Sequence, residues 1–126
     1  MFVERKLLRL LLHDPRGVER VRGRTAPADF QDGVAREIAE ALWRGEPPPM
    51  AGEAAVLARE LAAEAIEVPD PEGELDLTVR FMVERRLRRE KREREEALRR
   101  NPAGADALRL MHEIEDIARS LRNLSK

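Results

Sequence analysis

The sequence has no cysteine and few aromatic residues. Without cysteine, the chain can form no disulfide and offers no thiolate for catalysis or for a zinc or iron–sulfur centre. Aromatic residues make up only 3% of the 126 residues, so a core must consist mainly of Leu, Ala, Val and Ile. This composition is typical of helical bundles and predicts an all-α fold.

Long apolar runs are also missing. A membrane span needs roughly 20 apolar residues, and no segment approaches that length. The first residues, MFVERKLLRLLLHD, are amphipathic and charged where a signal peptide would be apolar. We therefore expect a cytoplasmic protein with no membrane contact.

Residues that carry catalytic chemistry are scarce. The only histidines, His13 and His112, fall on different predicted helices, and no HExxH, P-loop or GxGxxG pattern occurs. A group of acids lacks EF-hand spacing, so we interpret it as a solvated loop and not as a cation site. These acids are Glu67, Asp70, Glu72, Glu74 and Asp76. We expect no catalytic residue, no metal and no cofactor.

The most distinctive segment that is present is ERRLRREKREREEALRR, residues 84–100, which has no apolar residue between Leu87 and Ala97. A helix that is polar on every side links two bodies through solvent or depends on ion pairs along its own surface. Opposite charges recur here at a spacing of four, and each pair stabilises an isolated helix by roughly 0.2–0.5 kcal/mol. Examples are Glu84 with Arg88, Arg89 with Glu93, Lys91 with Glu95 and Glu95 with Arg99. The segment predicts an exposed, charged helix.

The net charge of −1 hides a strong segregation of charge. Residues 1–24 carry seven Arg or Lys against three acids, whereas residues 53–76 carry eight acids against one Arg. Residues 84–100 again have an excess of bases, nine against five. A nucleic-acid-binding protein would more simply have a single basic face, so we expect no direct nucleic-acid binding.

Helical periodicity and stop signals predict the elements. Asp32 is a good N-cap, and the two prolines and one glycine of residues 68–74 indicate a loop. In the long helix, we expect Leu77, Phe81, Val83 or Met82, and Leu87 to face the body. The predicted helices cover residues 2–13, 16–22, 33–44, 53–66, about 75–100 and about 106–124. They predict a helical bundle over residues 1–83, followed by a long exposed helix and a C-terminal helical hairpin over residues 84–126.

The last predicted helix is strongly amphipathic. Its apolar stripe consists of Ala107, Leu110, Ile114, Ile117, Leu121 and Leu124. Folded back on the charged helix, this stripe meets mostly Arg and Lys stems, so the hairpin has more apolar surface on one arm than on the other. Surplus apolar surface on a protruding element indicates a site for a partner.

Several of these segments together resemble a known family. They are ERKLLRLLLHDP (residues 4–15), PADFQD (27–32), the helix ending in ALW (41–43), the long charged helix, and LMHEIEDIARSLRNL (110–124). They resemble the carboxy-terminal helicase-binding domain of bacterial replicative DNA primase. The front half is similar also to the amino-terminal domain of the replicative helicase. The Arg/Glu-rich helix, followed by a last helix that ends soon after Leu121, favours the primase.

The resemblance implies a noncatalytic domain that binds the N-terminal domains of the hexameric helicase and couples primer synthesis to DNA unwinding. It also implies that the parent protein is a DNA-directed RNA polymerase, with zinc-binding and polymerase domains outside this chain. The docking element would be the hairpin, about residues 97–124. On it, the exposed side of the last helix is expected to bind the partner through Leu108, Met111, Glu115, Arg119 and Arg122.

Three alternatives stay open at this point. The chain could be the helicase's own N-terminal domain, an oligomerisation module that receives the primase. It could instead bind nucleic acid through its basic first helix and charged helix, with an affinity that falls steeply with salt. The hairpin could also exchange between two chains in a swapped homodimer.

Overall fold

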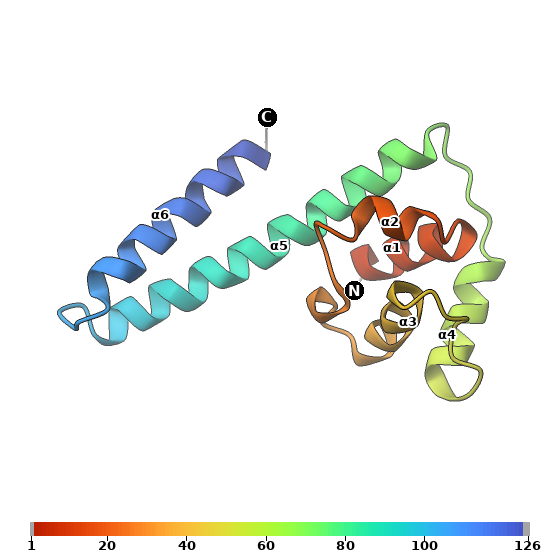
Figure 1. The fold of residues 1–126 in the computed structure, drawn as a ribbon, viewed down its shortest axis with the longest axis horizontal. Coiled ribbons are helices and arrows are strands. Elements are labelled where there is room, and N and C mark those ends of the chain that lie inside the picture. The colour runs from red at the N-terminus through yellow and green to blue at the C-terminus, as the bar shows by residue number, and fades with distance from the viewer. Residues whose placement is uncertain (1, 125–126) are drawn as a thin grey trace. The chain divides into compact units, whose positions relative to one another are not determined.

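The computed structural model describes residues 2–124, and its regular structure over that range consists entirely of helices (Figure 1). The predicted all-α class is confirmed. The chain forms two compact units, which divide inside the longest helix between Met82 and Val83. The sequence places this division one residue later. The elements are α1 (Phe2–His13), α2 (Gly17–Val21), the 3-10 turn η1 (Pro27–Asp29), α3 (Gly33–Trp43), α4 (Gly52–Ala63), α5 (Pro71–Arg100) and α6 (Ala107–Leu124).

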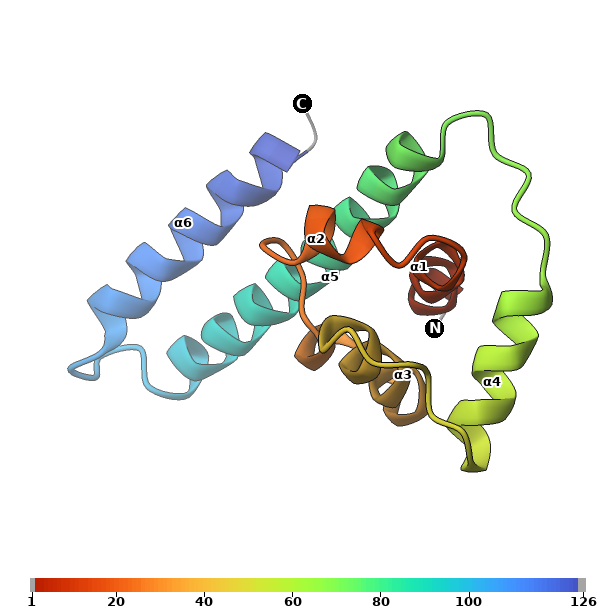
Figure 2. The same ribbon diagram turned by 45° about the vertical axis from the view of Figure 1, so that its right-hand side comes forward.

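In the first unit, α1 is the central helix. Figure 2 views α1 nearly along its axis, with α2 to its left, the first turns of α5 above it, α3 below it and α4 to its lower right. The leucines of α1 are too dense for one stripe, and four of them are buried. The buried leucines are Leu7, Leu8, Leu10 and Leu11. Around them, the other helices of the unit build its core.

A buried carboxylate connects α1 to the segment that precedes α3. Glu4 is fully buried, and its oxygens accept hydrogen bonds from the backbone N–H groups of Gln31 (3.2 Å) and Asp32 (3.1 Å). Asp32 in turn accepts a hydrogen bond from the N–H of Ala35 and caps α3, as predicted. The segment ERKLL therefore supplies the carboxylate that satisfies backbone N–H groups of the segment PADFQD.

Small side chains bring α4 close to α1 and α3. The buried residues of α4 are Ala54, Ala55, Leu57, Ala58 and Leu61. The helix ends at Ala63, three residues before the predicted end at Ile66. At Glu64 the backbone is extended, and the Glu64 carboxylate forms an ion pair with Arg9 (3.0 Å) in place of a further helical turn.

The start of α5 corrects the predicted loop. α5 begins at Pro71, about four residues before the predicted start. The Asp70 carboxylate accepts a hydrogen bond from the N–H of Gly73 (3.1 Å), and Pro71 occupies the first turn, where a missing N–H costs nothing. The combination Asp-Pro is thus a helix start here, although two prolines and a glycine favoured a loop.

The side of α5 that faces the first unit also differs from the prediction. Leu77 and Phe81 are 40% and 54% exposed, so the expectation that they face the body is wrong. Thr78 is buried instead, because its hydroxyl donates a hydrogen bond to the C=O of Glu74 (2.7 Å) and needs no other partner. The buried residues of α5 are Leu75, Thr78, Val79 and Met82.

Ion pairs explain the charge segregation of the sequence. The carboxylate of Asp76 accepts hydrogen bonds from Arg20 (3.0 and 2.7 Å) and from Arg24 (2.8 Å). These bonds, first those from Arg20, lower the pKa of Asp76 to about 2. The interpretation of the acids as a solvated loop is therefore wrong for Glu72, Glu74 and Asp76, which lie in α5 and form ion pairs. Further pairs between early bases and later acids are Lys6 with Glu74, Arg9 with Glu64, and Arg20 with Glu72.

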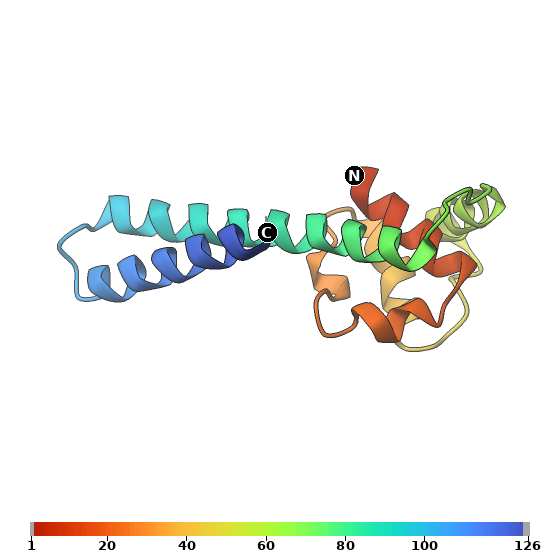
Figure 3. The ribbon, with the colours of Figure 1, turned by 90° about the horizontal axis from the view of Figure 1, so that it is seen from above.

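In the second unit, α6 lies beside the second half of α5, as Figures 1 and 3 both show. Arg94 on α5 donates a hydrogen bond to Glu113 on α6 (2.6 Å), which sets the register of the two helices. The predicted apolar stripe of α6 faces inward, and Ile117 is its most buried residue. Along α5, the predicted pairs Glu84–Arg88, Arg89–Glu93 and Lys91–Glu95 form, whereas Arg99 contacts Glu96.

Candidate partner-binding surface on the hairpin

The five residues that were expected to bind a partner lie on one side of α6. They are separated by three, four, four and three positions, a spacing that returns to the same side at each helical turn. All five side chains are exposed. We call this surface the outer face of α6; it consists of Leu108, Met111, Glu115, Arg119 and Arg122. The structure brings these residues together, and their role in binding stays a prediction.

The outer face begins with an apolar pair. Leu108 is 65% exposed and Met111 is 52% exposed, and both lie in the first turns of α6 after the hairpin connection. Single exposed apolar residues are ordinary on protein surfaces. Two large ones, three positions apart on a helix whose apolar stripe lies on its other side and is buried at Ile117, are a stronger sign of a contact surface.

The outer face ends with charged groups that the chain does not neutralise. Within residues 2–124, Glu115 and Arg122 form no ion pair or hydrogen bond through their side chains. Arg119 contacts Asp116 at 3.4 Å, three positions earlier on the same helix, and both side chains are exposed. By contrast, Arg94 of α5 is paired across the hairpin with Glu113 of α6. The outer charges are therefore available to a partner.

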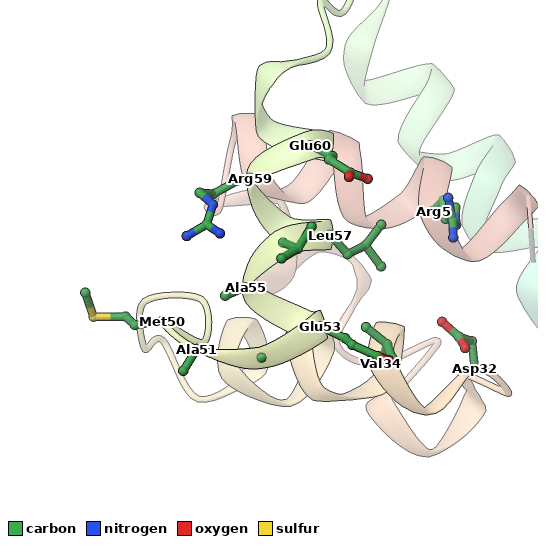
Figure 4. Close-up of a pocket in the computed structure, with 12 residues that line it drawn as sticks. Arg5, Asp32, Val34, Met50, Ala51, Glu53, Ala55, Leu57, Arg59 and Glu60 are labelled. Carbon is green, nitrogen blue, oxygen red and sulfur yellow. The ribbon is translucent and has the colours of Figure 1, made fainter.

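A second candidate surface lies in the first unit. It is a groove of about 690 Å³ between α1, the start of α3 and α4. Figure 4 shows Arg5 of α1 and Glu60 of α4 on opposite sides of it. Its apolar lining includes Val34, Met50 and Val56. Sequence reasoning missed this groove because it forms only where three helices meet.

Other kinds of site find no support in the described part of the chain. Residues 2–124 contain no group of three or more His, Asp or Glu side chains placed to hold a metal ion. His13 and His112 are both exposed and lie in different units. Nor does any helix in this range combine the length and apolar character required to cross a membrane.

The carboxylates with shifted pKa values are surface ion pairs. A hydrogen bond from Arg16 lowers the pKa of Asp14, and hydrogen bonds from Arg20 and Arg24 lower that of Asp76. A general acid or base near neutral pH needs a carboxylate pKa that is raised instead. The carboxylates of Asp14 and Asp76 therefore belong to structural ion pairs.

Comparison with known proteins adds no further information: no family model, curated protein or solved structure matches the chain. The function is therefore inferred from the residues and surfaces described above.

Proposed function

We propose that this chain is a noncatalytic protein-interaction domain of bacterial DNA primase. It binds the N-terminal domains of the hexameric replicative helicase and couples primer synthesis to DNA unwinding at the replication fork. The observation that carries this proposal is the outer face of α6, with its exposed apolar pair and its unneutralised charges. That face lies on the hairpin, the element that the primase resemblance implies for docking.

The network around Glu4 supports the resemblance at the level of the fold. Glu4 and Asp32 belong to the segments shared with both the primase domain and the helicase N-terminal domain, and both residues have structural roles here. The shared signature therefore concerns how α1 and α3 pack, and it is neutral about the partner. The alternative that the chain is the helicase N-terminal domain depends on this signature alone. The hairpin surface favours the primase domain.

The ion pairs of the first unit do not favour direct binding of nucleic acid. Lys6, Arg9 and Arg20 lie in the basic N-terminal region, and each contacts a carboxylate of the same chain. Phosphate groups of a nucleic acid would have to displace those carboxylates. Less positive charge is therefore available for phosphate binding than the number of basic residues suggests.

Deletion of residues 101–126 tests the role of the hairpin. The first unit has its own core, so we expect the truncated chain to keep helical circular dichroism and the fluorescence of Trp43, a buried residue of that unit. Its affinity for the helicase hexamer, measured by calorimetry, should fall by at least 100-fold because the docking surface is gone.

A double variant in the groove of the first unit is the control. Met50→Ser with Val56→Ser changes two exposed apolar residues, as a change at Leu108 and Met111 would, but outside the hairpin. This variant should bind like the parent chain. Full affinity of the truncated chain, or loss of binding in the groove variant, would assign docking to the first unit and contradict the proposal.

A further inference from the structure

The outer face of α6 has a definite chemical order along the helix. Leu108 and Met111 form an apolar zone, Glu115 follows as an acid, and Arg119 and Arg122 form a basic zone. At a rise of 1.5 Å per residue, the fourteen steps from Leu108 to Arg122 span about 21 Å. The face is therefore long enough to lie across a partner helix or groove, with each zone meeting a different part of it.

Few side-chain contacts within the chain would be lost when the outer face binds a partner. Arg122 and Glu115 have no side-chain partner in residues 2–124 that would have to be given up. The contact between Arg119 and Asp116 is an exposed pair within one helix, at 3.4 Å, and such pairs contribute little. The three charged groups can thus exchange water for groups of a partner.

A second copy of the chain does not fit this face. In an antiparallel pairing centred on Glu115, which covers the whole face, Glu115 meets its own copy and Leu108 lies opposite Arg122. In a parallel pairing, every charge meets a charge of the same sign. Both arrangements are unfavourable, so the face fits a surface of different composition.

We propose that the outer face docks on a partner surface with the complementary order: an apolar recess that receives Leu108 and Met111, a cation that meets Glu115, and carboxylates that meet Arg119 and Arg122. This inference rests on the proposed function and gives the chemistry of the helicase surface that receives the hairpin. The apolar zone supplies most of the affinity, because charge pairs at a solvated rim contribute less. The charged zones fix the direction in which α6 lies.

Three full-length variants test this order by titration into the helicase hexamer at two salt concentrations. Leu108→Ala with Met111→Ala should weaken binding at least tenfold at both. Arg119→Glu with Arg122→Glu should weaken binding at least tenfold at low salt and less at high salt, because screening reduces the new repulsion. Glu115→Lys should weaken binding about threefold to tenfold. Arg92→Glu with Arg100→Glu is the control: it makes the same charge change at exposed positions of α5 and should change affinity less than twofold.

The outcomes separate the two proposals. If the parent chain does not bind the helicase, the proposed function fails and this inference with it. If the parent chain binds and the three variants bind equally well, the proposed function stands and the outer face is not the docking surface. Tighter binding by either charge variant would show that the partner has the opposite order of charge. The circular dichroism of all variants should equal that of the parent chain. If Arg119→Glu with Arg122→Glu lowers the helicity, Arg119→Gln with Arg122→Gln is used in its place, and its affinity for the helicase should fall threefold or more.

Discussion

Replacement of Glu4 by alanine should strongly destabilise the first unit. The Glu4 carboxylate is fully buried and accepts hydrogen bonds from the N–H groups of Gln31 and Asp32. Alanine removes both acceptors and leaves two backbone donors next to the core without partners. It also frees the segment between η1 and α3, whose position depends on this contact.

The size of the effect follows from these two donors. A buried donor left without a partner costs about 1–3 kcal/mol, and water that enters the space left by the carboxylate recovers part of this. We therefore expect Glu4→Ala to lower the free energy of unfolding by about 3 kcal/mol. Glu4→Gln keeps one acceptor oxygen but turns an NH₂ group toward the second N–H, so it should cost about half as much. Against a typical total stability of about 5–15 kcal/mol, both losses are large.

Urea denaturation followed by the fluorescence of Trp43 measures this loss. Trp43 is the only tryptophan, and its ring packs edge-to-face on Phe30 at a centroid distance of 6.2 Å, so its emission reports on the first unit. Glu37→Ala is the matched control, since Glu37 is an exposed glutamate of α3, and it should change stability by less than about 0.5 kcal/mol. The reasoning is refuted if Glu4→Ala is no more destabilising than Glu37→Ala.

Two further predictions concern the helix ends and the ion pairs. Asp32→Ala should lower stability by about 1 kcal/mol in the same assay, because α3 loses the cap at the N–H of Ala35; an unchanged midpoint would contradict that role. Asp76 has a folded pKa of about 2, below its ordinary 3.8, so it stabilises the fold above pH 3.8 and loses this contribution as the pH falls through 2. Asp76→Asn should therefore lower the free energy of unfolding at pH 7 by up to about 1 kcal/mol, a value limited by solvent screening. The difference in stability from the parent chain should shrink as the pH falls toward 2, and a difference independent of pH would contradict the pairing.

The helix positions were largely predictable because their local signals are strong. α1 has the predicted bounds, and Asp32 caps α3 as its position before Gly33 indicates. The start of α5 was misassigned because Asp70 and Pro71 form both a turn signal and a helix start, and only the following residues decide between them.

Which face of α5 is buried could not be read from hydrophobicity alone. Leu77 and Phe81 are the larger apolar residues, yet Thr78 occupies a buried position. That choice depends on a local hydrogen bond to Glu74 and on the pairing of Asp76 with Arg20, which joins segments 56 positions apart. Contacts between residues so distant in sequence leave no periodic signal.

The candidate surface on α6 was more accessible to sequence reasoning. In an amphipathic helix, the position of the apolar stripe also decides which residues lie on the outer side. The exposure of Leu108 and Met111 therefore follows from the positions of Leu110 and Ile117. The groove of the first unit could not be predicted from the sequence. It forms between α1, α3 and α4 and depends on how these three helices pack.

Calorimetric titration of the chain into the hexameric replicative helicase from the same source, at physiological salt, tests the central claim most directly. The proposal predicts saturable binding with fewer copies of this chain than helicase subunits. Absence of any complex, together with self-association of the chain into rings by mass measurement, would contradict it and favour the helicase N-terminal domain.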